Sequence, residues 1–163
     1  MTTVYLALGS NEGNRQEYID KAIHYLRELP GVHILKSSTV REYPALEQAT
    51  GQNPFLNSVL SMSTDFLPLD LLHKLQVIER RLGRQSKGDQ APRTIDLDIL
   101  SFGDDLIIQG KTLVLPHPRI HERIFVLEPL AEINPQWIHP RFKKSAQLLL
   151  EELKAQSQCA PSS

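Results

Sequence analysis

The sequence predicts a single α+β domain in which helices pack on an antiparallel sheet. Apolar residues recur at helical spacing in two segments, and short β-type segments surround them in the order β-α-β-β-α-β. That order is the split β-α-β arrangement of ferredoxin-like folds. With 163 residues, 40% of them hydrophobic, the chain is long enough to bury one core.

The first half of this pattern comprises a strand, a helix and two further strands. Gly9 ends the first apolar segment, Asn14 can cap the helix, and Pro30 ends that helix. The predicted ranges are 3–10 for the first strand, 14–29 for the helix, 32–43 for one long second strand and 55–64 for the third.

The second half begins with a helix whose first turn suits Pro68 and whose leucines form one apolar stripe that ends at Gly83. The predicted ranges are 68–82 for this helix, 94–102 for a fourth strand, a hairpin around Gly110, short helical pieces over 120–133 and a last helix over 145–153. We expect one domain over 1–155 and a disordered tail over 156–163.

Composition excludes several classes of protein. The 18 basic and 19 acidic residues nearly balance, so a general nucleic-acid or membrane-surface binder is not indicated. No apolar run approaches the ~20 residues that span a bilayer. Cys159 is the single cysteine, which rules out an intrachain disulfide and a cysteine metal site. The N-terminus lacks the features of a secretory signal, and we expect a cytoplasmic protein that acts as a monomer.

Two acidic residues interrupt the otherwise apolar segment PRTIDLDILSFG (92–103). Asp96 and Asp98 are two apart, which in a strand places both carboxylates on one face. Such a pair can hold two divalent ions, as in phosphoryl-transfer sites, where magnesium takes one or two carboxylates and completes its shell with water and phosphate. A solvated strand face and two separate ion pairs are the alternatives.

A cluster of cations precedes the aspartates. Arg80 and Arg81, at a helix end, are expected on the surface, where the helix dipole favours them. Arg84 and Arg93 flank a polar loop, and the planar guanidinium suits phosphate oxygens. Cations beside a pair of acids are what a magnesium–polyphosphate complex requires.

A second basic segment, LPHPRIHERIF (115–125), contains His117 and His121 four residues apart. A zinc pair is not favoured, because no Glu follows the first His and Pro118 interrupts the register. Contact of a His or Arg with phosphate is the functional interpretation, and a hydrogen-bonded structural histidine is the alternative. The GKT at 110–112 lacks the earlier glycine of a P-loop and is predicted to be a hairpin turn.

Asn57 is polar within an apolar strand. A buried amide must be paired, so Asn57 either satisfies a neighbouring backbone group or contacts the edge of a heteroaromatic ligand. Phe55 shares its face by the period of two. On the second helix, Gln76 and Glu79 lie three apart, and taken alone they indicate a solvated helix edge off the apolar stripe.

Five motifs together carry a family resemblance: GSN after the first strand, FLN in the third, IERRLGR, PRTIDLDIL and LPHPRIHERIF. Over about residues 3–140 the chain resembles the 6-hydroxymethyl-7,8-dihydropterin pyrophosphokinases of folate biosynthesis. The resemblance implies a three-layer α-β-α fold. It also implies transfer of a diphosphate from ATP to the hydroxymethyl oxygen of the pterin, with release of AMP.

The resemblance implies roles for individual residues. Asp96 and Asp98 match the ligands of two Mg²⁺ ions and, with Arg84 and Arg93, the catalytic set. The positions implied for ATP are Gln76, Glu79, Arg84, Arg93, Ile99, His117 and Arg123. Those implied for the pterin are Tyr43, Ala45 and Leu46 through a loop backbone, Asn57 as the amide that contacts the ring, Phe55 and Phe125 as the aromatic residues on either side of it, and Asp96.

One loop departs from the resemblance. Many members of the family carry a longer, more basic segment ending in R-W-G-P-R, whereas this chain has SKGDQAPR at 86–93. The tryptophan is missing, and Lys87 supplies a point charge without the bidentate fork of an arginine. Closure of this loop over ATP is therefore expected to differ.

Two other functions fit parts of the pattern. A nucleotidyltransferase of the polymerase-β kind also joins a Gly-Ser turn to a D-x-D strand, but there the two lie close in sequence, whereas Ser10 and Asp96 are 86 positions apart. A ferredoxin-like RNA-binding module would use the loop from Arg84 to Arg93 and would bind RNA in a strongly salt-dependent way. It would have no need of the two aspartates.

Overall fold

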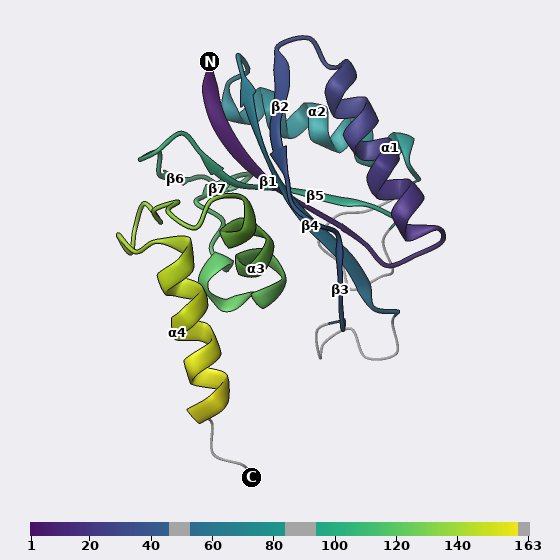
Figure 1. The fold of residues 1–163 in the computed structure, drawn as a ribbon. Helices are drawn as coiled ribbons and strands as arrows, with labels where there is room; N and C mark the ends of the chain where they lie inside the picture. Colours follow the sequence, from purple (N-terminus) through teal and green to yellow (C-terminus); the bar gives the residue numbers. More distant parts are fainter. Residues whose placement is uncertain (46–52, 84–93, 160–163) are drawn as a thin grey trace.

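A computed structural model describes residues 1–45, 53–83 and 94–159 of the chain. A five-stranded sheet lies at its centre, with helices on both sides (Figure 1). The strands are β1 (Thr2–Ser10), β2 (Val32–Ser37), β3 (Arg41–Tyr43), β4 (Phe55–Thr64), β5 (Asp96–Phe102), β6 (Ile108–Gln109) and β7 (Val114–Leu115). The helices are α1 (Arg15–Glu28), α2 (Pro68–Arg81), the 3-10 turn η2 (Ile120–Glu122), α3 (Ile124–Ile133) and α4 (Ala146–Cys159).

The sheet has the topology that the element order predicts. Its strand order is β2-β4-β1-β5, with β3 also beside β4, and every pairing is antiparallel. β1 and β4 are therefore central, and β5 is an edge strand. This confirms the ferredoxin-like fold.

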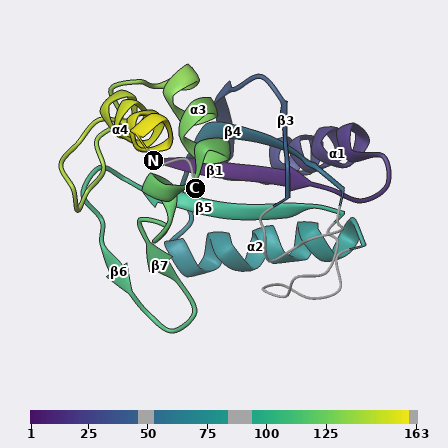
Figure 2. The ribbon, with the colours of Figure 1, turned by 90° about the horizontal axis from the view of Figure 1, so that it is seen from below.

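The helices form the two outer layers (Figure 2). α1 and α2 cover one face, where a core that includes Leu6, Leu60 and Leu97 is buried. α3 and α4 cover the other face over a second core that includes Val59 and Leu100. The chain is thus a three-layer α-β-α domain. None of the helices in the described ranges is long and apolar enough to cross a membrane.

The first two helices begin where their capping residues predict. Asn14 accepts a hydrogen bond from the backbone N–H of Glu17 (3.1 Å), which satisfies a free donor at the start of α1. Pro68 occupies the first turn of α2, where its missing N–H is not needed. The buried residues of α2 include Leu71 and Leu75, as their spacing predicts.

The predicted long strand over 32–43 is wrong, because the regular β ladder is interrupted between β2 and β3. The Ser38 hydroxyl accepts a hydrogen bond from the Val59 N–H (2.9 Å) and lies 3.0 Å from the Ser58 hydroxyl. The side chain thus meets β4 in this gap, and ladder pairing resumes only at Arg41.

The C-terminal elements are of the predicted types, but their bounds differ from the predicted ones. α4 ends at Cys159 rather than 153, so residues 156–159, predicted as part of a disordered tail, are helical. Residues 160–163 lie outside the described ranges. The GKT segment is a hairpin turn between β6 and β7, as predicted, closed by a hydrogen bond from the Gly110 N–H to the Leu113 carbonyl (3.0 Å).

A buried histidine anchors the turn that precedes α4. His139 is 2% exposed, and its Nδ1 accepts hydrogen bonds from the N–H groups of Arg141 (3.1 Å) and Phe142 (3.2 Å). Its ring stacks on Phe142 at 4.3 Å and meets Trp137 edge-on at 5.7 Å. Burial lowers the pKa of His139 to about 4, and the neighbouring His121 and Arg141 add to the effect.

Folding stability is therefore expected to depend on the protonation of His139. The pKa of His139 is near the ordinary histidine value of 6.5 in the unfolded chain and near 4 in the folded chain. The contribution of neutral His139 to the free energy of unfolding is present in full above pH 6.5. It is lost as the pH falls toward 4, by up to about 1.4 kcal/mol per pH unit. Denaturant unfolding at pH 7.5 and pH 5 measures the loss. In His139→Asn, which keeps an acceptor near the Nδ1 position, the loss should be smaller, and equal losses in both proteins would contradict the assignment.

Candidate active site

The two aspartates lie on one face of the sheet. α3 covers the same face farther along β5, where Leu100 is buried. On β5, Asp96 and Asp98 are partly exposed, while Leu97 and Ile99 are buried in the core beneath α1 and α2. Asp96 lies opposite Gly9 on β1, and Asp98 lies opposite Ala7. The predicted placement of both carboxylates on one face is confirmed.

Gly9 separates the carboxylates from Asn57, because it pairs with Asp96 on one side and with Asn57 on the other. A Cβ at Gly9 would lie 3.0 Å from Asn57 Nδ2 and 3.5 Å from Phe55 Cδ1. The Asn57 amide and the Phe55 ring therefore occupy the space that a side chain on β1 would take. With strands ~4.8 Å apart, the Asp96 and Asn57 backbones are about 10 Å apart.

The Asn57 amide has an unused acceptor. Its Oδ1 is buried and has no hydrogen-bond partner among the described residues. A buried acceptor without a partner costs about 1–3 kcal/mol. Of the two interpretations of Asn57, this favours contact with a ligand over pairing with the backbone.

Three aromatic residues lie on the face of the sheet that carries Asn57. Tyr43 lies directly opposite Phe55 in the β3–β4 ladder, so their side chains stand on the same face. The Phe125 ring comes from the first turn of α3 and lies 6.2 Å from that of Tyr43. Tyr43 is the last residue of β3, as the predicted strand end at residue 43 has it, whereas the family resemblance implied a loop position.

Arg123 brings a cation to the aspartates. It is half-buried just before α3, and its guanidinium lies 5.5 Å from the centre of the Phe125 ring. Burial lowers the pKa of Arg123, and the charges of Asp98 and Asp96 oppose that shift. The guanidinium is thus within electrostatic reach of both carboxylates.

His117 is tied to the same edge of the sheet. Its backbone N–H donates to the carbonyl of Leu100 (2.8 Å), two residues after Asp98 on β5. Its Nδ1 accepts a hydrogen bond from the Arg119 N–H (3.2 Å). The structure therefore brings His117 and Arg123, which are far from Asp98 in the sequence, to one side of the aspartate strand.

Glu79 corrects the prediction of a solvated helix edge. It is 3% exposed on α2, and its Oε2 accepts a hydrogen bond from the Leu97 N–H (2.8 Å). Leu97 lies between the two aspartates on an edge strand, so this carboxylate holds that strand from the opposite face. The spacing did contain the signal, because Leu75 and Leu82, both buried, are four residues before and three after Glu79.

Comparison with known proteins identifies the family. The family model for 7,8-dihydro-6-hydroxymethylpterin-pyrophosphokinase (HPPK) matches residues 5–135. The 2-amino-4-hydroxy-6-hydroxymethyldihydropteridine pyrophosphokinase of Aquifex aeolicus is 43% identical over 161 residues, which are 99% of this chain and 96% of that protein. The protein of the same name from Bacillus subtilis is 42% identical over 132 residues, 81% of this chain and 78% of the relative.

The chain belongs to the HPPK family. The resemblance seen in the sequence motifs is therefore confirmed, and the two alternative functions, nucleotidyl transfer and RNA binding, are set aside. A crystal structure of HPPK-DHPS in complex with substrates aligns with a TM-score of 0.73 at 16% identity. It covers 99% of this chain, which spans 45% of the longer one, and at that identity it supports the HPPK fold alone.

Of the remaining residues predicted for the site, some are described by the structure and others are not. Gln76 and Ala45 are half-buried on α2 and just after β3. The side chain of Ile99 is 4% exposed in the core beneath α1 and α2, so the structure does not bring it to the face that carries the aspartates. Leu46, Arg84, Arg93 and the departing loop at 86–93 lie outside the described residues.

The metal-binding capacity of the site rests on the two aspartates. In the described ranges, no group of three or more His, Cys, Asp or Glu side chains could hold a metal ion. Two carboxylates suit magnesium, which takes one or two from the protein when it also binds phosphate and water. The donor set therefore fits the magnesium that the family resemblance implies.

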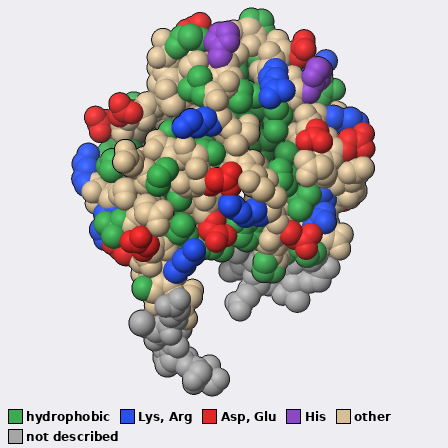
Figure 3. Space-filling view, viewed as in Figure 1, with side chains coloured by type: hydrophobic (Ala, Val, Ile, Leu, Met, Phe, Trp, Pro, Cys, Tyr) green, Lys and Arg blue, Asp and Glu red, His purple; other side chains and the backbone are tan. Residues whose placement is uncertain are grey.

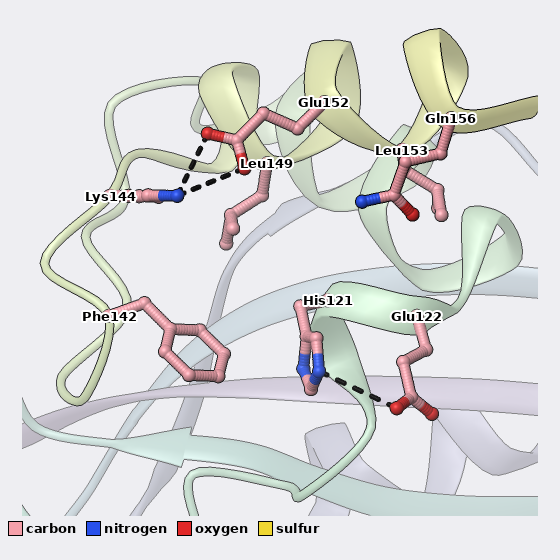
Figure 4. A pocket seen from close by; sticks show the side chains of 8 residues that line it. All are labelled: His121, Glu122, Phe142, Lys144, Leu149, Glu152, Leu153 and Gln156. Atoms are coloured by element: carbon pink, nitrogen blue, oxygen red, sulfur yellow. Dashed lines mark hydrogen bonds and ion pairs between the residues drawn. The ribbon is translucent and has the colours of Figure 1, made fainter. Parts of the chain in front are cut away.

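A hollow of about 360 Å³ lies apart from these residues, between η2, the turn after His139 and α4 (Figure 4). Its polar groups face one another in pairs: Lys144 lies 3.0 Å from Glu152, and His121 lies 3.6 Å from Glu122. None of the residues predicted for ATP, pterin or metal lines it.

Removal of the Glu79 acceptor should destabilise the aspartate strand. Glu79→Ala leaves the buried Leu97 N–H without this partner, and the free energy of unfolding should fall by about 1–3 kcal/mol. Glu79→Gln keeps an acceptor oxygen and should lose less. Denaturant unfolding checks both, with Glu28→Ala, an exposed glutamate at the end of α1, as the control. Equal losses in Glu79→Ala and Glu28→Ala would show that the hydrogen bond contributes nothing.

Proposed function

We propose that this chain transfers a diphosphate group from ATP to the hydroxymethyl oxygen of 6-hydroxymethyl-7,8-dihydropterin, with Asp96 and Asp98 as the ligands of the magnesium ions that accompany ATP. Membership of the HPPK family supports the reaction. The observation that carries the assignment of the site is the shared face of the two aspartates. The charges of both also oppose the fall in the pKa of Arg123 that burial causes.

The opposite side of Gly9 is proposed to receive the pterin. A pterin is flat and carries N–H donors on its edge. The free Oδ1 of Asn57 can accept from such a donor, and the rings of Phe55 and Phe125 can pack on the faces of the heterocycle. The hydroxymethyl group would then point across Gly9 toward the aspartates.

Catalysis in this arrangement consists of positioning and charge neutralisation. The hydroxymethyl oxygen forms a bond to the β-phosphorus of ATP as the bond from that phosphorus to the AMP oxygen breaks, and the hydroxyl proton is released. Magnesium, when bound, would neutralise phosphate charge and lower the pKa of the attacking hydroxyl. Asp96 and Asp98 would hold two ions, and Arg123 and His117 are proposed to bind phosphate oxygens.

Two arginines outside the described ranges and one residue of α2 complete the proposal. Arg84 and Arg93 are proposed to bind the phosphates, and Gln76 to lie near the nucleotide. We also propose that the protein acts in the cytoplasm, where ATP is available, as a monomer on small-molecule substrates. A stable dimer in sedimentation at assay concentrations would contradict the last point.

AMP release tests the proposed reaction. With ATP, magnesium and the hydroxymethyl pterin, the protein should release AMP in an amount equal to the pterin diphosphate formed. Release should stop when the pterin is omitted or when a chelator removes the metal. Formation of inorganic pyrophosphate in place of AMP would identify nucleotidyl transfer and overturn the proposal.

Asp98→Ala should separate metal binding from pterin binding. Loss of one carboxylate should lower magnesium-dependent kcat by about 100-fold or more, since even residues that only support metal ligands typically cost 10- to 100-fold. Binding of the pterin alone, measured by calorimetry, should change little. Asp105→Ala, an exposed aspartate shortly after β5, is the matched control. Turnover like that of the wild type in Asp98→Ala would remove the metal assignment.

A further inference from the structure

β3 depends on side-chain contacts for its position. It has three residues, and in the described part of the chain it pairs with β4. Two further contacts join it to α3: the Arg41 guanidinium lies 2.8 Å from Glu132, and the Tyr43 hydroxyl donates a hydrogen bond to Glu128 (2.7 Å). Figure 3 shows acidic and basic side chains next to one another over this region.

The contact between Tyr43 and Glu128 lies beside the proposed pterin site. Glu128 follows Phe125 by three residues in α3, so the two side chains are neighbours on the helix. Tyr43 lies opposite Phe55 in the ladder, and its ring is 6.2 Å from that of Phe125. The hydrogen bond therefore joins the helix that carries one aromatic ring to the strand pair that carries the other ring and Asn57.

The hydrogen bond between Tyr43 and Glu128 is strong enough to hold β3 and α3 at a fixed separation. A hydroxyl that donates to a carboxylate makes a charge-assisted hydrogen bond, which is stronger than one between neutral groups. Tyr43 is 9% exposed, and its burial, followed by the bond to Glu128, raises the pKa of the hydroxyl, so that it stays a donor at neutral pH. The second oxygen of Glu128 lies 3.8 Å from Lys154 of α4, a partly exposed ion pair that contributes little.

We propose that Glu128 is a positioning residue for the pterin site. By accepting the hydrogen bond of Tyr43, it sets the separation between Phe125 on α3 and Phe55 on β4, and so the width of the gap that a flat ring would fill. The inference rests on the proposed function and adds to it a residue that contacts neither substrate. Asp96 and Asp98 lie on β5, on the far side of β1. α3, which Arg123 precedes, is also held by its own core through Val126 and Leu127, so loss of the bond should displace the short strand β3 and affect the pterin more than the nucleotide.

Steady-state kinetics with both substrates tests the role of Glu128. Tyr43→Phe and Glu128→Ala each remove the hydrogen bond and should raise the KM for the pterin about 5- to 20-fold, which is less than the full effect of one charge-assisted bond because this bond acts on the pterin indirectly. The KM for ATP and kcat should stay within about twofold. The double variant should be no worse than either single variant, because both remove the same bond. Glu128→Gln keeps an acceptor and should stay near the wild type.

Tyr5→Phe is the matched control. The Tyr5 hydroxyl accepts a hydrogen bond from Asn134 Nδ2 (2.8 Å) just after the last residue of α3, so the same atom is deleted at a contact with the C-terminal end of the same helix. This variant should lose stability without any change in the KM for the pterin. Two outcomes would reduce Glu128 to a structural role and overturn the inference. One is an equal KM for the pterin in Tyr43→Phe and Tyr5→Phe. The other is an increase in the KM for ATP in Tyr43→Phe as large as the increase in the KM for the pterin.

Direct binding separates this inference from the proposed function. A wild-type protein that releases no AMP with the pterin would overturn the proposed reaction. Calorimetry with 6-hydroxymethylpterin alone would still decide the role of Glu128. Weaker binding in Tyr43→Phe and Glu128→Ala, but not in Tyr5→Phe, supports the inference; equal binding in all four proteins, or none in the wild type, contradicts it.

Discussion

The alternation of side chains along β5 is the constraint on which the site depends. Leu97 and Ile99 are buried beneath α1 and α2, and each stabilises the fold by about 1.5–3 kcal/mol. A slip of one residue would bury Asp96 and Asp98 and expose both apolar side chains, so the register is strongly specified. Glu79 adds to it by accepting the Leu97 N–H at the edge of the sheet. Residues that touch no substrate thus hold the carboxylates in place.

The site has two halves of different chemistry, and one glycine separates them. Asp96 and Asp98 lie on one side of Gly9, and Asn57 lies on the other with its amide in the space above the glycine. The first half is charged and suits metal and phosphate; the second is aromatic with one unused acceptor and suits a flat heterocycle. Because a central strand joins them, their separation is set by the spacing of strands rather than by a flexible loop.

The two halves also differ in which part of the chain builds them. The split β-α-β unit supplies the aspartates, Gly9 and Asn57. The segment after β5 turns back across the sheet, and α3 and α4 cover its second face over a separate core. That segment contributes Arg123 and Phe125, and Glu128 and Glu132 of α3 hold β3. The ferredoxin-like unit alone would present the acids on an uncovered face, without the cation and the third aromatic ring that lie near them here.

What the sequence by itself determined are the properties that depend on neighbours along the chain. The period of two placed Asp96 and Asp98 on one face, helical spacing located α1 and α2, and the motifs indicated the family. Only the tertiary structure decided which elements meet. It showed the break at Ser38, the hydrogen bond from the Leu97 N–H to Glu79, and the contact between Tyr43 and Glu128, which are 85 residues apart. Periodicity states which side of an element is buried, whereas the partner on that side is set by the packing of distant segments against one another.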